Sequence, residues 1–64
     1  MLYDFRAFRM EVGVHNFWVV ESLDLKSCQA CGDTIEEALK EFESAELKWL
    51  QIAKEHDIPI PERK

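Results

Sequence analysis

The sequence has few glycines and prolines, no basic cluster and no long apolar run. Its 64 residues include two Gly and two Pro, while 47% are hydrophobic and 33% charged, a composition typical of a folded chain. The longest uninterrupted apolar run, Phe17 to Val20, is far shorter than the roughly 20 residues of a membrane span. Charges at Asp4, Arg6 and Arg9 stand where a signal peptide needs an apolar core. We therefore expect a cytoplasmic domain with no membrane partner.

The shortage of basic residues limits the possible partners. Eight Lys and Arg are dispersed along the chain against 13 Asp and Glu, which gives a net charge of −5. Duplex binding needs clustered Lys and Arg to neutralise phosphates, so we expect no direct contact with nucleic acid and a better fit to a basic protein. A globule of this size buries only roughly 60% of the surface that its unfolded chain exposes. We expect one domain over residues 1–64 whose marginal stability is supported by an oligomer or a partner.

One long helix dominates the sequence pattern. Thr34, with Glu37 three residues later, predicts a capped helix start in which the Thr34 hydroxyl accepts from the Glu37 amide and the Glu37 carboxylate reaches back to the Thr34 amide. The helix is predicted to fade at His56 and Asp57. Apolar residues recur along it at steps of three and four and form one stripe: Ile35, Ala38, Leu39, Phe42, Ala45, Trp49, Ile52 and Ala53.

Short strands are predicted on both sides of this helix. The alternation of residues predicts strands at about Tyr3 to Glu11, at Phe17 to Ser22 and at Cys28 to Gly32. After the helix, Ile58 to Pro61 permits only a short edge strand, because proline has no amide donor. The predicted fold is α+β with the order βββαβ: a three-stranded antiparallel sheet, one long helix and a short C-terminal strand.

The predicted sheet is apolar on both faces. In the first strand the apolar side changes between Ala7 and Phe8, which either a β-bulge or a true change of side would explain. The second strand is apolar on both parities. One helix covers one face, so one of two pairs is left without cover from its own chain: Phe17 and Val19, or Trp18 and Val20. Trp49 is expected in the core, whereas Trp18 fits the core and a contact surface equally.

Cys28 and Cys31 form a CxxC motif, which raises the question of a metal or redox site. Positions three apart on a strand point to opposite faces and lie roughly 10 Å apart, too far for a disulfide and unsuited to one tetrahedral ion. We interpret both cysteines as packing residues, and His15 and His56 as structural. No metal and no cofactor are expected.

Several short motifs around the helix occur together in this chain. They are Asp24-Leu25-x-x-Cys28, the run GDTIEEAL from Gly32 to Leu39, Trp49 late in the helix, and Ile58-Pro59-Ile60-Pro61. This combination resembles the antitoxin domain of the HicB family of bacterial toxin–antitoxin systems, over about Trp18 to Pro61. The resemblance implies a degenerate ribonuclease-H-like sheet. It also implies that the chain binds a small basic mRNA-cleaving toxin of the HicA type and covers its active site and RNA surface.

The family commonly carries a C-terminal DNA-binding segment, and we expect none in residues 1–64. The ribonuclease-H-like description brings two-metal nuclease chemistry into question, with Glu21 and Asp24 as the candidate acids. That chemistry needs three or four converging acids, so we interpret both as structural and expect no enzyme.

The leading hypothesis is therefore a HicB-like antitoxin. The alternative is an orphan HicB-like domain that self-associates and binds another protein. In either case we expect a homo-oligomer, most simply an isologous dimer, formed through the second sheet face, the terminal strand or both. Leu47 and Leu50 add an apolar edge beside the helical stripe. The residues predicted to contact a partner or a second copy are Phe17, Trp18, Val20, Leu23, Asp24, Leu47, Leu50, Ile58 and Ile60.

Overall fold

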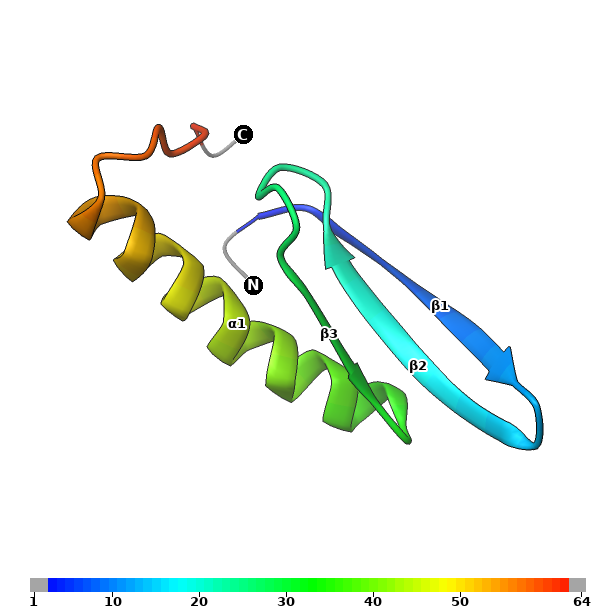
Figure 1. Cartoon of the computed structure of the whole chain (residues 1–64). Coiled ribbons are helices and arrows are strands. Elements are labelled where there is room, and N and C mark those ends of the chain that lie inside the picture. The colour runs from blue at the N-terminus through cyan, green and yellow to red at the C-terminus, as the bar shows by residue number, and fades with distance from the viewer. Residues whose placement is uncertain (1–2, 63–64) are drawn as a thin grey trace.

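The computed structural model describes residues 3–62 and consists of three strands followed by one helix (Figure 1). The strands are β1 (Phe5–Val12), β2 (His15–Ser22) and β3 (Gln29–Gly32), and the helix is α1 (Ile35–Glu55). The strands form one antiparallel sheet in the order β1-β2-β3. The predicted α+β class, the three-stranded antiparallel sheet and the single long helix are confirmed.

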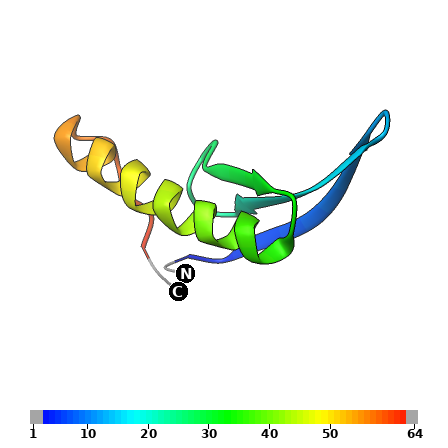
Figure 2. The same cartoon turned by 90° about the horizontal axis from the view of Figure 1, so that it is seen from below.

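A two-residue turn joins β1 to β2. Val12 pairs with His15, so Gly13 and Val14 form the loop, and β2 begins two residues earlier than the sequence pattern predicts. Gly13 has a φ of 62°. A glycine with positive φ at the first central position is typical of a type II′ turn, whose twist matches that of the flanking strands. The hairpin extends past the start of α1 and curves away from it (Figure 2).

The pairing of β1 with β2 is continuous from Phe5↔Ser22 to Val12↔His15, with no bulge. The change of parity between Ala7 and Phe8 is therefore a true change of side. Phe5 faces the helix, where its ring lies 5.8 Å from that of Phe42. The apolar residues of the second half of β1 consequently lie on the opposite face of the sheet.

The helix begins as predicted, with one difference in the cap. The Thr34 hydroxyl accepts from the Glu37 amide at 3.2 Å, but the Glu37 carboxylate accepts from the Asp33 amide rather than from the Thr34 amide. At the other end, Asp57 has a φ of 54° and the Ile58 amide donates to the Ala53 carbonyl at 2.8 Å. This left-handed residue and the bond across it form a Schellman-type stop.

The helix packs on β3 and β2, and the core lies between them. Most of the predicted stripe is buried or half-buried, but Ile52 is 52% exposed and Glu46 is buried in the middle of the helix. The Glu46 carboxylate accepts a hydrogen bond from the Tyr3 amide at 3.2 Å. The buried stripe is thus rotated slightly from the one that apolar spacing predicts, because Tyr3, which precedes β1, supplies a polar partner there.

The loop between β2 and β3 contributes to the core as much as a strand does. Leu25 is 1% exposed and belongs to the core cluster. The Ser22 hydroxyl accepts from the Asp24 and Leu25 amides, and the Trp49 indole donates to the Lys26 carbonyl at 2.9 Å. The turn therefore depends on the Ser22 hydroxyl and on the helix.

The predicted strand at 58–61 is not formed, since no strand is assigned after α1 within the described residues. This segment runs instead as an irregular chain that turns back from the helix end (Figure 1). The Tyr3 hydroxyl donates to the Pro61 carbonyl at 2.7 Å, which holds the segment near the start of β1. Its two prolines remove the amide donors that a strand ladder needs.

Phe42 is the largest fully buried side chain. Phe42→Ala is expected to lower the free energy of unfolding by about 3–5 kcal/mol, because it leaves a cavity under β2 and β3 that the surroundings fill only partly. Urea unfolding followed by circular dichroism measures this. Phe8→Ala, on the far face of the sheet, is the control and is expected to cost clearly less. Equal losses would mean that the core has been assigned to the wrong face.

Gly32, at the end of β3, lies against the first turn of the helix. A Cβ at this position would stand 2.6 Å from the Ala38 amide nitrogen and 2.8 Å from Glu37 Cβ. Gly32→Ala is therefore expected to destabilise the fold by about 1–3 kcal/mol, since backbone must shift to admit one methyl group. Gln29→Ala, at an exposed position of the same strand, is the control and is expected to stay within about 0.5 kcal/mol of the parent in the same melt.

Candidate interaction surfaces

The face of the sheet opposite the helix is not covered by any element of residues 3–62. Directly paired residues of antiparallel strands share a face, so Met10 with Phe17, and Phe8 with Val19 and Cys31, lie together on the side opposite Val20 and Phe5. The five residues on this outer side, unlike Val20, are all at least partly exposed. We call this side the outer sheet face and define it by its apolar residues: Phe8, Met10, Val12, Phe17, Val19 and Cys31.

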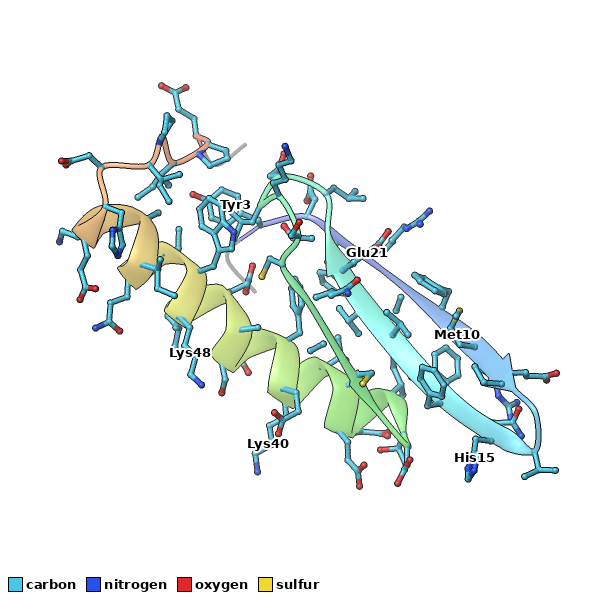
Figure 3. The ribbon with its side chains drawn as sticks, in the orientation of Figure 1. Tyr3, Met10, His15, Glu21, Lys40 and Lys48 are labelled. Atoms are coloured by element: carbon cyan, nitrogen blue, oxygen red, sulfur yellow. The ribbon has the colours of Figure 1, made fainter. Side chains whose placement is uncertain are left out.

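Polar groups frame the outer sheet face at its two ends. At one end Arg6 and Glu21 form an ion pair, and the Arg6 guanidinium lies 5.2 Å from the centre of the Phe8 ring. At the other end His15 lies beside Val12, where a shallow hollow of about 540 Å³ opens between the hairpin and β3. Met10, His15 and Glu21 mark the middle and the ends in Figure 3. The sequence pattern indicated this face through the parity change after Ala7, but did not show that β1 would stay unbulged.

The predicted contact residues do not form one surface. Val20 is completely buried beneath the helix and has no surface for a partner, so its prediction is wrong. Trp18 and Leu50 are half-buried against the core, which answers the question left open for Trp18. Phe17 lies on the outer sheet face. The rest are wholly or partly exposed at separate places along the loop, the helix and the C-terminal segment: Leu23, Asp24, Leu47, Ile58 and Ile60.

A second candidate surface is formed by exposed acids at the start of α1 and along its first half. We call it the acidic helix surface and define it by Asp33, which precedes α1, and by Glu36, Glu41 and Glu43, all exposed; Glu41 and Glu43 lie on opposite flanks of the helix. Lys40 is the one basic residue between Asp33 and Glu43. Beyond Glu43 the exposed charged residues of the helix are Lys48, Lys54 and Glu55, so the negative charge of the helix surface is concentrated in its first half. Lys40 and Lys48 project from the side of the helix away from the sheet (Figure 3).

A small groove lies beside the second half of the helix. Its volume is about 290 Å³, and it runs between the β2–β3 loop and the chain that follows α1. Trp49, Ile52 and Ile58 supply its apolar walls and Lys26 one rim. Ile52, placed in the core by its spacing, is exposed here instead. No charged group is enclosed in this groove. It could hold an apolar group, but it does not provide a set of polar side chains that would make it specific for one ligand.

The two cysteines lie in different environments, as the spacing predicted. Cys28 is buried in the core and Cys31 is exposed on the outer sheet face. Burial raises the pKa of the Cys28 thiol, and the nearby Glu46 carboxylate raises it further. A thiol held protonated in this way is a poor nucleophile and a poor metal ligand. Among residues 3–62, no three His, Cys, Asp or Glu side chains converge closely enough to hold a metal ion.

The two acids considered for nuclease chemistry have other surroundings. Glu21 pairs with Arg6, its direct neighbour across the β1–β2 ladder. Asp24 lies in the loop that follows β2 and is half-buried. His15 and His56 stand at the hairpin turn and at the helix C-cap, at opposite ends of the molecule (Figure 1). These groups do not assemble into a common site in the described part of the chain.

Comparison of the chain with protein-family models, with curated proteins and with solved structures finds no match in any of the three. Within the described residues, α1 is not apolar enough over its length to cross a membrane.

The raised pKa of Cys28 leads to a pH dependence of stability. The folded state holds this proton more tightly than the unfolded chain, so the contribution to stability is complete below the unfolded thiol pKa of about 8.5 and is lost as pH rises toward the higher folded value. Urea melts at pH 7 and above pH 9 are expected to show this loss for the parent and for Cys31→Ala. Cys28→Ala should not show this loss of stability at alkaline pH. If the free energy of unfolding of that variant fell with pH as it does for the parent, the loss would not come from the Cys28 thiol.

Proposed function

We propose that this chain is a HicB-like antitoxin. In this role it is a protein-binding module that neutralises a small basic mRNA-cleaving toxin of the HicA type by covering the toxin's active site and RNA surface. The domain supplies no chemistry of its own, and it acts by occupying the surface that the toxin needs for RNA. Its acidic charge is the property that a basic partner would recognise.

The residues that carry the family resemblance have structural roles in this fold. Leu25 and Cys28 are buried in the core, a Cβ at Gly32 would collide with the first turn of the helix, and Thr34 caps the helix. These positions support a shared architecture over the region of the motifs. The same motifs also contain exposed residues, among them Asp33 and Glu36 of the acidic helix surface.

The observation that carries the proposal is the concentration of negative charge in the first half of α1. Glu36 and Glu37 lie in the first turn, where carboxylates are stabilised by the helix dipole and serve the helix itself. Glu41 and Glu43 lie beyond that turn, are exposed, and gain no such stabilisation. Four exposed acids with one lysine among them form a negative surface that attracts a basic protein and speeds its association.

The alternative function, an orphan HicB-like domain that self-associates and binds another protein, is favoured by a different surface. The outer sheet face is apolar and carries little charge, so it gives a basic toxin no electrostatic advantage. The two functions therefore depend on different residues and can be tested separately.

The antitoxin proposal predicts a partner and a contact. A reading frame next to this one that encodes a basic protein of roughly 60–80 residues, the size range of a small domain, is expected to arrest growth when expressed alone. Co-expression of this chain should restore growth. Replacing Glu41 and Glu43 together by Lys is expected to weaken binding by at least about 10-fold, or about 1.4 kcal/mol, in titration calorimetry at low salt.

The matched control is the double variant Glu11→Lys with Glu55→Lys, which makes the same change in net charge at two exposed sites away from the acidic helix surface. It is expected to bind and rescue as the parent does. If both double variants lost affinity equally, the effect would come from net charge alone, and Glu41 and Glu43 would not be the toxin contact. A basic neighbour that neither arrests growth nor binds would refute the antitoxin function.

A further inference from the structure

The chain exposes more surface than a monomer of its mass normally does. Its accessible area is 5040 Å² for 7.5 kDa, whereas folded monomers of this mass expose about 4,250 Å². The excess is about 800 Å², so this chain is more open than a compact monomer of the same mass. The radius of gyration is 12.7 Å, against about 11 Å for a compact chain of this length.

The projecting half of the β1–β2 hairpin contributes to this open shape, as does the end of α1 that extends beyond the sheet on the other side (Figure 2). Gly32 at the end of β3 pairs with Trp18, so residues 10–12 and 15–17 form a ribbon of only two strands. A two-stranded ribbon is marginally stable in water unless one face is covered. The projecting half is polar on the helix side, with Glu11 opposite Asn16, and apolar on the outer sheet face, with Met10 opposite Phe17.

The charges of the outer sheet face distinguish between possible occupants. Arg6 and Glu21 neutralise each other at one end, and His15 is the remaining titratable side chain of β1 and β2 on that side. The face therefore carries almost no net charge in a chain whose total is −5. Two copies can meet there without bringing their acidic helices together, because the helix lies on the opposite side of the sheet.

From these observations we propose that the outer sheet face is a self-association surface, on which a second copy of this chain packs face to face in an isologous dimer. The two ribbons then cover each other's apolar side, and both acidic helix surfaces remain open. This inference goes beyond the proposed function and does not depend on it, since it requires no toxin.

The size of the face predicts the strength of the dimer. Strands of eight residues measure about 26 Å, and three strands span about 14 Å. The total area buried by two such faces falls below about 1,200 Å², in the class of weak and reversible interfaces. We therefore expect a dissociation constant in the micromolar range, with dimer and monomer in exchange.

Sedimentation of the chain alone between 1 and 200 µM tests this, concentrations chosen to bracket a micromolar constant. A mass that rises from monomer to dimer is expected. The test variant combines Met10→Lys with Phe17→Glu, which keeps the net charge and places opposite charges directly across the ladder, where they support the hairpin. It is expected to raise the dissociation constant at least 10-fold while its far-ultraviolet circular dichroism and thermal melt remain cooperative.

The control variant combines Val14→Glu with Leu47→Lys. These side chains are 91% and 62% exposed and lie at the hairpin tip and on the helix, so the same chemical change is made off the outer sheet face. It is expected to dimerise as the parent does. Protection of the Cys31 thiol provides a second measurement: its rate of modification by a bulky maleimide, read by mass spectrometry, should fall as the concentration of the parent rises.

Three outcomes would overturn the proposal. One is a parent that stays monomeric at 200 µM. Another is a dimer that survives in the Met10 and Phe17 variant, which would assign association to the free edge of β1 or to another surface. The third is Cys31 labelling that does not change with concentration, which would leave the face open to a different protein or to a lipid surface.

Discussion

The structure depends on one constraint: a sheet has two faces, and this chain provides one helix. α1 packs on β2 and β3 over Phe42, Ala38 and Val20, and that contact holds the whole core. Burial of these side chains is the main source of stability in so small a domain. Every apolar residue that points the other way must be covered by something else or stay in water. The division of roles between the two faces follows from this.

The helix-facing side is fixed by close contacts that leave few alternatives. Gly32 leaves room for the backbone of the first helical turn. Hydrogen bonds to the Ser22 hydroxyl and from the Trp49 indole hold the loop that places Leu25 in the core. The Glu46 carboxylate accepts a hydrogen bond from the Tyr3 amide. The outer sheet face has no such contacts, and its side chains pack only on their neighbours within the sheet. The helix-facing side of the sheet is thus fixed by specific contacts, whereas the outer sheet face is apolar and uncovered. An uncovered apolar face of this kind is typical of an interaction surface.

Sequence reasoning predicted the elements well and the surfaces less well. Local signals, such as the Thr34 cap and the three-and-four spacing, lie within a few residues, so they identify the helix and its start. Whether β1 would bulge after Ala7 depended on pairing with β2, which the sequence of one strand does not contain. Spacing placed Ile52 in the core and left Glu46 off the buried stripe, but Glu46 is buried and Ile52 is exposed. A residue distant in sequence, Tyr3, supplies the hydrogen-bond donor that the buried carboxylate needs. The terminal strand is not formed: Pro59 and Pro61 lack the amide donors of a strand ladder, and the segment is held by the Tyr3 hydroxyl instead.

The hydrogen bond from Tyr3 to Pro61 has a consequence for how this domain can be joined to others. Residues 58 apart in sequence are held side by side, at the end of the molecule far from the Gly13–Val14 turn (Figure 1). A short linker could connect these two positions, and new chain ends could be opened at the exposed turn, so the fold is suited to circular permutation. A domain fused before Tyr3 or after Pro61 would therefore start from the same corner and keep the hairpin free.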